Sequence, residues 1–379
     1  MNTAVGRWGG WAVRVGVLAA VFLAAQPPNR LSAQDSQFGI RGLGTPGKLE
    51  SVRARTTGGA FAPFDAFSPL TDAVLADVRR LSASFTSGTS WRSVDASGVQ
   101  SSLRGTRFPA MVIAGPVTRR IVVGGGFSTY LDRSFGVVIH DTIDLRGVQQ
   151  PITDAITSDG AIADLRIAVA ARLHRRLALG LGLHRITGST RVNATRSFAD
   201  TANYRTTTAR DEVAYGATGG SASLLFDVTS DLRVAGWFRT DTKLRADVGG
   251  HTVAENDLPL TYGTGLQWRA GGRASLAGSL TWRNWGAVQS IANAHDTFNW
   301  SVGAEIGSPA SPFRFGLRGG QLPFGVGKTP TEVGFSGGLG RQFSGGRGRL
   351  DIGLERLQRS GTGLNERVWT FLLGLTVRP

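Results

Sequence analysis

Apolar and polar residues alternate over long runs of this chain, most clearly in the stretch 258–284. From Leu260 to Trp268 every second residue is larger or more apolar than the small or polar residues between them, and the alternation resumes from Ala274 to Trp282. Side chains of a strand alternate between its two faces, so these runs predict two β-strands. Gly271-Gly272 predicts a tight hairpin turn between them.

This hairpin is typical of a membrane-spanning sheet. Its polar face is rich in Gly and Ser, and Trp268 and Trp282 lie near strand ends. A strand with lipid on one face and a wet lumen on the other has this pattern. We therefore expect the outward residues of the hairpin to face lipid: Tyr262, Leu266, Trp268, Leu276, Leu280 and Trp282.

The same alternation recurs along the chain and predicts fourteen strands. They span residues 79–92, 108–117, 120–131, 162–173, 177–184, 212–227, 232–242, 257–268, 273–284, 297–307, 312–320, 331–343, 347–357 and 366–377. The polar segments 132–161 and 188–211 are predicted to be long external loops, because bacterial barrels have short periplasmic turns and long outer loops. Open sheet edges are not tolerated in lipid, so the predicted fold is all-β: a closed, antiparallel, up-and-down transmembrane β-barrel.

The N-terminus has the pattern of a secretory signal peptide. Arg7 and Arg14 precede an apolar run at 15–25, and small residues end at Ala33. Cleavage is predicted after Ala33, with Ala25 as a second possible site. The chain contains no cysteine, which excludes a disulfide scaffold and a lipidated cysteine.

The formal net charge is +15. Nucleic-acid binding, attraction to anionic lipid or substrate, and plain surface charge could each account for it. The basic residues are scattered singly and form no patch interleaved with aromatic residues, which argues against nucleic acid as a partner. Anionic surroundings are compatible with the charge.

Residues 34–78 lack a strand period and are predicted to form a plug, or hatch, inside the barrel. Three aromatic residues, Phe61, Phe64 and Phe67, favour packing against another part of the protein over a disordered leader. Residues 70–78 are expected to form a short helix. The predicted organisation is a signal peptide at 1–33, a plug at 34–78 and a barrel at 79–379.

A run near the mature N-terminus carries a family resemblance. Residues 53–61 read Arg-Ala-Arg-Thr-Thr-Gly-Gly-Ala-Phe, ahead of the alternating strands. The chain in this respect resembles the FadL family of outer-membrane channels for hydrophobic compounds, and their PorV-like relatives in secretion systems. The resemblance implies an N-terminal hatch inside a fourteen-stranded barrel. Where the family continues with Asn-Pro-Ala, this chain has Thr71-Asp72-Ala73.

Motifs of enzyme chemistry lack their required context. Gly334-Phe335-Ser336-Gly337-Gly338 fits G-x-S-x-G but lies in an alternating strand, where a nucleophile elbow needs a strand–turn–helix. The run 325–329 has Leu322 where a phosphate-binding loop requires Gly. The five histidines are far apart in sequence, with His184 on a lumenal face, and all five are expected to be solvated. No catalytic residue, metal site or cofactor site is predicted.

Charged residues on the polar faces of the strands are candidates for the lumen. They are Arg166, Arg172, Arg283, Arg314, Arg318, Glu332, Asp351 and Glu355. An Arg or Lys facing lipid at the bilayer midplane costs about 2–4 kcal/mol, so these side chains are expected to point inward. A satisfied network of lumenal charges is the more general expectation, and a role in substrate binding is the alternative.

The resemblance implies a monomeric barrel in the bacterial outer membrane that is not an enzyme and takes up hydrophobic or amphipathic small molecules, such as fatty acids, passively. Phe61, Phe64 and Phe67 are the candidate ligand or plug contacts. The last strand, 366–377, resembles the C-terminal strand that the outer-membrane assembly machinery reads, although Arg378-Pro379 replaces the usual terminal aromatic residue. The alternative is a PorV-like or structural barrel that docks a secreted protein and transports no small molecule.

Overall fold

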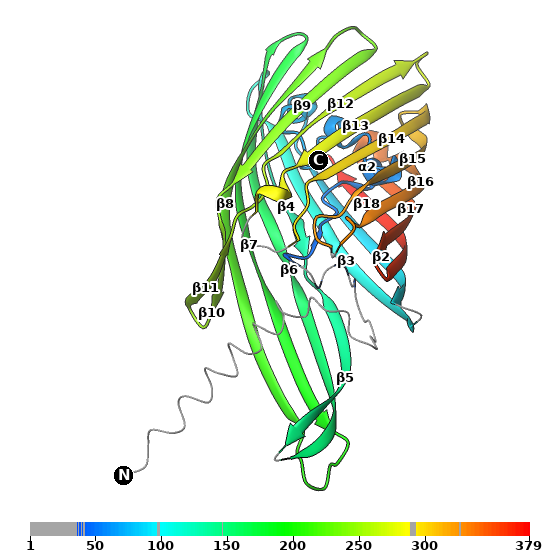
Figure 1. The fold of residues 1–379 in the computed structure, drawn as a ribbon. Coiled ribbons are helices and arrows are strands. Elements are labelled where there is room, and N and C mark those ends of the chain that lie inside the picture. The colour runs from blue at the N-terminus through cyan, green and yellow to red at the C-terminus, as the bar shows by residue number, and fades with distance from the viewer. Residues whose placement is uncertain are drawn as a thin grey trace.

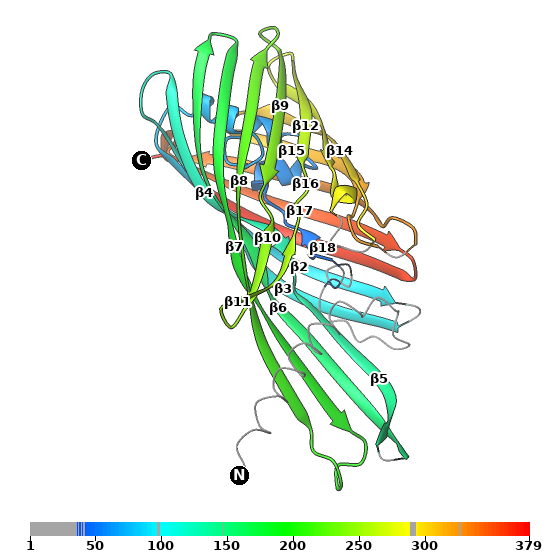
Figure 2. The ribbon, with the colours of Figure 1, turned by 60° about the vertical axis from the view of Figure 1, so that its left-hand side comes forward.

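The computed structural model describes residues 36, 38, 40, 42–96, 99–145, 147–288, 293–325 and 327–379. The predicted signal peptide lies outside them. The described strands form one closed antiparallel wall, and residues 42–78, which we call the lumenal segment, lie within it (Figures 1 and 2). None of the helices found in these ranges is long and apolar enough to cross a membrane.

Fourteen strands make the barrel wall, each paired with its two neighbours, and β18 closes the barrel on β2. They are β2 (Ser82–Ala96), β3 (Val99–Pro116), β4 (Ile121–Asp132), β6 (Val148–His174), β7 (Leu177–Phe198), β8 (Thr207–Asp227), β9 (Leu232–Asp241), β12 (Thr261–Ala270), β13 (Ala274–Arg283), β14 (Thr297–Ser308), β15 (Ser311–Gln321), β16 (Thr331–Phe343), β17 (Gly348–Gly361) and β18 (Leu364–Val377). Each contains or overlaps one of the fourteen predicted strands, so the predicted barrel is confirmed.

The two predicted long loops are wrong. Residues 132–161 contribute β5 (Phe135–Leu145) and the first half of β6, and residues 188–211 continue β7 and begin β8. The hairpin β10 (Leu244–Val248) and β11 (His251–Asn256) extends the same sheet and was not predicted. Strands β5–β8 project well beyond the rest of the wall (Figure 1). Outward residues in the projecting parts of β6–β8 are largely polar and left no apolar stripe in the sequence. Strand β5 was missed although Phe135, Val137, Ile139, Ile143 and Leu145 recur with a period of two.

The outer surface of the wall is apolar. In the 258–284 hairpin, β12 and β13 pair as predicted around a turn at residues 271–273, with Tyr262 opposite Trp282. Five of the six residues predicted to face lipid are exposed large apolar side chains, and Trp282 is half-buried. Side chains between them turn inward and are buried or half-buried, as Gln267 and Ser279 illustrate.

Short elements order the lumenal segment: β1 (Thr45–Pro46), α2 (Val52–Thr56), and the 3-10 helices η2 (Ala62–Phe64) and η3 (Asp72–Asp77). The hydroxyl of Ser51 caps α2 by accepting a hydrogen bond from the Ala54 N–H at 3.2 Å. Helix α2 contacts β15–β18, whereas η3 contacts β4 and β6–β8 on the other side of the barrel. The segment thus bridges the lumen from wall to wall.

Inward-facing glycines of the wall let the lumenal segment approach closely. A Cβ on Gly180 of β7 would lie 2.2 Å from the backbone nitrogen of Ala73. A Cβ on Gly316 of β15 would lie 2.1 Å from the carbonyl carbon of Thr57. Both distances are too short for any side chain, so at these points the backbone of the segment packs directly on the backbone of the wall.

The wall is incompletely hydrogen-bonded between β3 and β4. Pairing runs only from Ala110 with Ser128 to Pro116 with Val122, and beyond it the strands diverge (Figure 2). Past that point β4 pairs instead with β1 of the lumenal segment. In the described part of the wall the ion pair between Arg107 and Asp132, at 3.0 Å, spans the two strands where the ladder has ended.

Candidate functional site

The lumenal segment is charged oppositely at its two ends. Residues 48–55 carry Lys48, Arg53 and Arg55 against one carboxylate, Glu50, whereas the later part carries Asp65, Asp72 and Asp77. The basic end faces carboxylates on β14, β16 and β17, and the acidic end faces arginines on β6 and β9. Reversing the segment would bring like charges together, so this arrangement fixes its orientation in the lumen.

On the acidic end, Asp72 accepts a hydrogen bond from Arg166 Nη1 at 2.9 Å, and both side chains are 2% exposed. Asp77 accepts hydrogen bonds from Arg172 and, at 2.8 Å, from Arg233. The Ala73 N–H donates to Ser223 Oγ at 2.8 Å. Helix η3 is therefore attached to three wall strands by charge-assisted or neutral hydrogen bonds.

On the basic end each cation has its own wall carboxylate. Lys48 Nζ lies 2.9 Å from Glu332, Arg53 Nη2 lies 2.7 Å from Glu305, and Arg55 pairs with Glu355. The last pair is 5% and 2% exposed. Removing one partner of a buried ion pair strongly destabilises a protein, so the pairs of Arg53 and Arg55 should hold the segment in one position.

Lys48 belongs to the lumenal segment and not to a spanning strand. Burial, together with repulsion from Arg318, lowers the pKa of its ammonium to about 8 in spite of the attraction of Glu332. Its protonation therefore changes near physiological pH.

The eight predicted lumenal charges lie on the inner face, and seven of them make ion pairs. Arg166 and Arg172 bind the lumenal segment, as do Glu332 and Glu355. Arg318 lies 2.5 Å from Glu355, and Arg314 lies 2.7 Å from Asp351. Arg283 makes no ion pair within the described ranges and lines a small cavity beside the segment. The sequence did not indicate Glu305 and Arg359, the partners of Arg314 and Glu332, although the same alternation places both on inner faces.

A Ser–His–Asp arrangement, which the sequence did not reveal, also lies in the lumen. His184 Nδ1 lies 2.9 Å from Asp164, and His184 Nε2 lies 2.9 Å from Ser221 Oγ. The expectation that His184 is solvated is wrong, because the side chain is 5% exposed. The Ser221 hydroxyl donates to Asp72 at 2.6 Å, so its proton is not directed at His184. The three residues thus extend the attachment of η3, and the arrangement lacks an activated serine.

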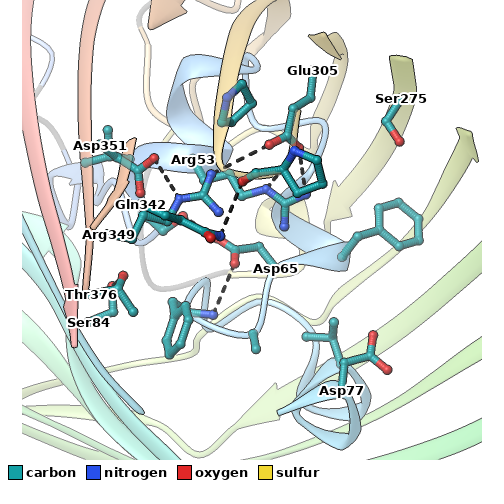
Figure 3. Close-up of a pocket in the computed structure, with 18 of the residues that line it drawn as sticks. Arg53, Asp65, Asp77, Ser84, Ser275, Glu305, Gln342, Arg349, Asp351 and Thr376 are labelled. Carbon is teal, nitrogen blue, oxygen red and sulfur yellow. Dashed lines mark hydrogen bonds and ion pairs between the residues drawn. The ribbon is translucent and has the colours of Figure 1, made fainter. Parts of the chain in front are cut away.

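A cavity of about 720 Å³ lies between the lumenal segment and the end of the barrel with the short turns (Figure 3). Phe64 and Phe67 line one side of it, and Arg53, Glu305, Arg349 and Asp351 line another. Phe61 is completely buried within the packing of the segment and does not line this cavity. The cavity therefore combines an aromatic surface with a strongly polar one.

A second cavity of about 100 Å³ lies beside the gap between β3 and β4, on the other side of the lumenal segment. Pro46, Arg107 and Pro109 are among its lining residues. The segment thus separates the space near the gap in the wall from the larger cavity at the short-turn end.

The remaining sequence motifs take structural roles. Ser336 lies within β16, and its hydroxyl accepts a hydrogen bond from the Gly58 N–H of the lumenal segment at 3.0 Å. Gly327 and Lys328 lie in the connection between β15 and β16, without a helix after them. Among the residues that the structure describes, no three or more metal-ligating side chains form a group that could hold a metal ion.

Comparisons with known proteins agree on the fold. No protein-family model matches the chain, and no curated protein matches its sequence. Among solved structures, a Pseudomonas aeruginosa FadL homologue matches with a TM-score of 0.63 and 12% identity, covering 89% of this chain and 100% of that one. The Pseudomonas putida toluene transporter TodX (TM-score 0.61, 11% identity) and the CymD monoaromatic hydrocarbon channel (0.56, 13%) each cover 89% of this chain and 98% of their own. This protein therefore has the FadL-like β-barrel fold.

Proposed function

We propose that the protein is a bacterial outer-membrane channel for passive uptake of hydrophobic compounds, with the lumenal segment as its hatch. The observation that carries this proposal is the position of the segment. It lies between a gap in the wall that faces lipid and a cavity of about 720 Å³ at the short-turn end. Short turns are periplasmic in bacterial barrels, so the cavity would open to the periplasm.

The chemistry of this path suits an apolar cargo. Beyond Ala110 no β3–β4 ladder closes the described wall, so a compound dissolved in the membrane could approach the lumen from the side. On the periplasmic side Phe64 and Phe67 offer an apolar surface within the cavity. FadL homologues, a toluene transporter and a monoaromatic hydrocarbon channel share the fold, which supports a hydrophobic cargo but does not select between fatty acids and hydrocarbons.

A disulfide that locks the hatch tests the proposal, because the natural chain contains no cysteine. Ala73→Cys with Ser223→Cys joins η3 to β8, where the Ala73 N–H already contacts the Ser223 hydroxyl at 2.8 Å. Thr89→Cys with Thr106→Cys is the matched control, since it joins two opposed wall residues of β2 and β3 that do not contact the segment. Disulfide formation is read from the mobility of the protein before and after reduction.

Uptake of radiolabelled fatty acid and of radiolabelled toluene is then measured separately in cells that display each variant. The oxidised hatch variant should take up little, a reductant should restore its uptake, and the control variant should be insensitive to reduction. Equal uptake by the oxidised and reduced hatch variants would overturn the proposal.

A docking function is the second candidate, because β5–β8 project far beyond the rest of the wall (Figure 1). One edge of this projecting sheet is β5, which pairs only with β6 in the described structure. An exposed edge can receive a strand from a partner. Stable co-purification with one secreted protein, combined with uptake that is indifferent to the hatch disulfide, would favour this alternative.

A further inference from the structure

Exposed arginines gather at the short-turn end of the barrel. Ten lie on or beside the short turns, at the start of the first wall strand, or at the end of the last strands: Arg79, Arg80, Arg119, Arg120, Arg175, Arg176, Arg269, Arg273, Arg341 and Arg347. Within the described ranges none of them has an ion-pair partner, and Asp231 is the single exposed carboxylate on the short turns. The excess positive charge of the chain is therefore concentrated at this end.

The opposite end of the barrel is electrically mixed. Arg196 lies 2.7 Å from Asp154 there, and Arg191 lies 3.7 Å from Glu212. Exposed carboxylates such as Asp141, Asp144 and Glu255 lie on strands at this end. If arginine were simply abundant on the whole surface, both ends would carry excess positive charge. The difference between them indicates that the two ends face different surroundings.

Six of these arginines do not line the large cavity, and we call them the arginine collar. They are Arg119 and Arg120 on the β3–β4 turn, Arg175 and Arg176 on the β6–β7 turn, and Arg341 and Arg347 at the β16–β17 turn. The β3–β4 and β6–β7 turns are neighbours, since β4 pairs with β6, and only β18 and β2 separate them from the β16–β17 turn, so the collar follows one arc of the wall.

Each turn of the collar adjoins an outward apolar residue. Val117 is 68% exposed beside Arg119, and Leu173 is 57% exposed beside Arg175. Phe343 is likewise exposed between Arg341 and Arg347. Because such residues mark the lipid-facing surface, the collar lies where hydrocarbon gives way to headgroups.

We propose that the arginine collar binds the phosphate groups of anionic phospholipids in the leaflet next to the short turns. A guanidinium presents a planar fork of N–H donors that matches phosphate, and it keeps its charge at any physiological pH. Basic residues beside a membrane surface are attracted to anionic headgroups. The exposed apolar residues beside each turn place the collar next to lipid, which favours a lipid headgroup over a protein partner as its ligand. This inference needs the barrel to be in a membrane but does not depend on its cargo.

Quenching of tryptophan fluorescence by brominated lipids tests the proposal, since Trp268 is exposed on the outer surface near this end. The mature protein is reconstituted in bilayers that contain brominated phosphatidylglycerol or brominated phosphatidylcholine. The ratio of quenching reports which lipid occupies the surface of the barrel. The test variant is R119Q/R120Q/R175Q/R176Q, and the control R205Q/R210Q/R245Q/R367Q removes the same charge from exposed arginines elsewhere.

At low salt the wild type should prefer phosphatidylglycerol over phosphatidylcholine roughly fivefold or more, because one arginine beside an anionic surface contributes about that factor. At high salt the preference should disappear, because the charges are screened. The test variant should lose most of the preference and the control should keep it. If the test variant does not fold, the salt dependence of the wild type decides alone. Two results would overturn the proposal. One is equal quenching by both lipids in the wild type, as expected if the collar instead docks an acidic protein. The other is an equal loss of lipid preference in the test variant and in the control.

Discussion

The guanidinium of Arg166, on wall strand β6, lies 2.9 Å from the carboxylate of Asp72, on the lumenal segment, with both side chains 2% exposed. The two residues are 94 positions apart in the chain. Asp72 also accepts the hydrogen of Ser221, which connects the pair to His184 and Asp164. One carboxylate thus ties the segment to three strands of the barrel, β6, β7 and β8.

Replacing that carboxylate should release η3. Asp72→Asn leaves the buried Arg166 without its ion-pair partner, and breaking such a pair costs about 3–5 kcal/mol. We expect faster hydrogen–deuterium exchange across residues 70–78, measured by mass spectrometry on the full mature protein, while the wall strands keep their protection. Asp231→Asn removes an exposed turn carboxylate without an ion pair and should leave exchange unchanged. Unchanged protection of η3 in Asp72→Asn would show that the pair does not hold it.

A methyl group at a glycine contact should displace the other end of the segment. Gly316→Ala places a Cβ where the Thr57 backbone lies, and overpacking of this kind costs about 1–3 kcal/mol. We expect increased exchange of α2 and the turn after it. Gly278→Ala is the matched control, because its Cβ would meet nothing closer than 3.6 Å. If both variants exchange alike, direct backbone contact is not what limits this region.

Arg55 and Glu355 should be energetically coupled. Arg55→Met and Glu355→Gln, alone and together, form a double-mutant cycle on a pair that joins α2 to β17. Contacting residues typically couple by about 0.5–3 kcal/mol. Glu355 also pairs with Arg318, so its charge stays partly compensated when Arg55 is replaced, and the coupling energy should lie below the upper end of this range. Protection of α2 against exchange measures the free energy of undocking in each variant. A coupling near zero would mean that the segment is held by packing alone.

Docking of the segment near Lys48 should strengthen as pH rises from about 8 to 10.5. The pKa of Lys48 is about 8 in the docked state and should return to its ordinary 10.5 when the segment is released. Between these values the released state binds more protons, so raising the pH favours the docked state. Protease resistance of residues 42–50 across this range measures the effect. Lys48→Met should flatten the pH dependence, and an equally steep dependence in that variant would assign it to another group.

The period-two alternation identified the barrel because a wall between lipid and a wet lumen requires it at every strand. Tyr262, Leu266 and Trp268 face outward as expected. The same rule failed in 132–161 and 188–211, where the strands leave the wall and neither face needs an apolar stripe. Phe61 and Phe64 are buried, in agreement with the prediction that the aromatic residues of the plug pack against another part of the protein. Their spacing in the sequence could not show which of them would line a cavity.

The sequence by itself determined that the chain alternates, closes and presents charges to its interior. Successive residues of a strand point to opposite faces, so position in the sequence decides which face each side chain occupies. The tertiary structure decided which charges meet. Asp72 meets Arg166, and Arg55 meets Glu355, 300 positions away, because closure of the barrel brings remote strands around one segment. It also showed that unpaired arginines, scattered along the sequence, come together on one end, since every second turn of an up-and-down barrel returns to the same side.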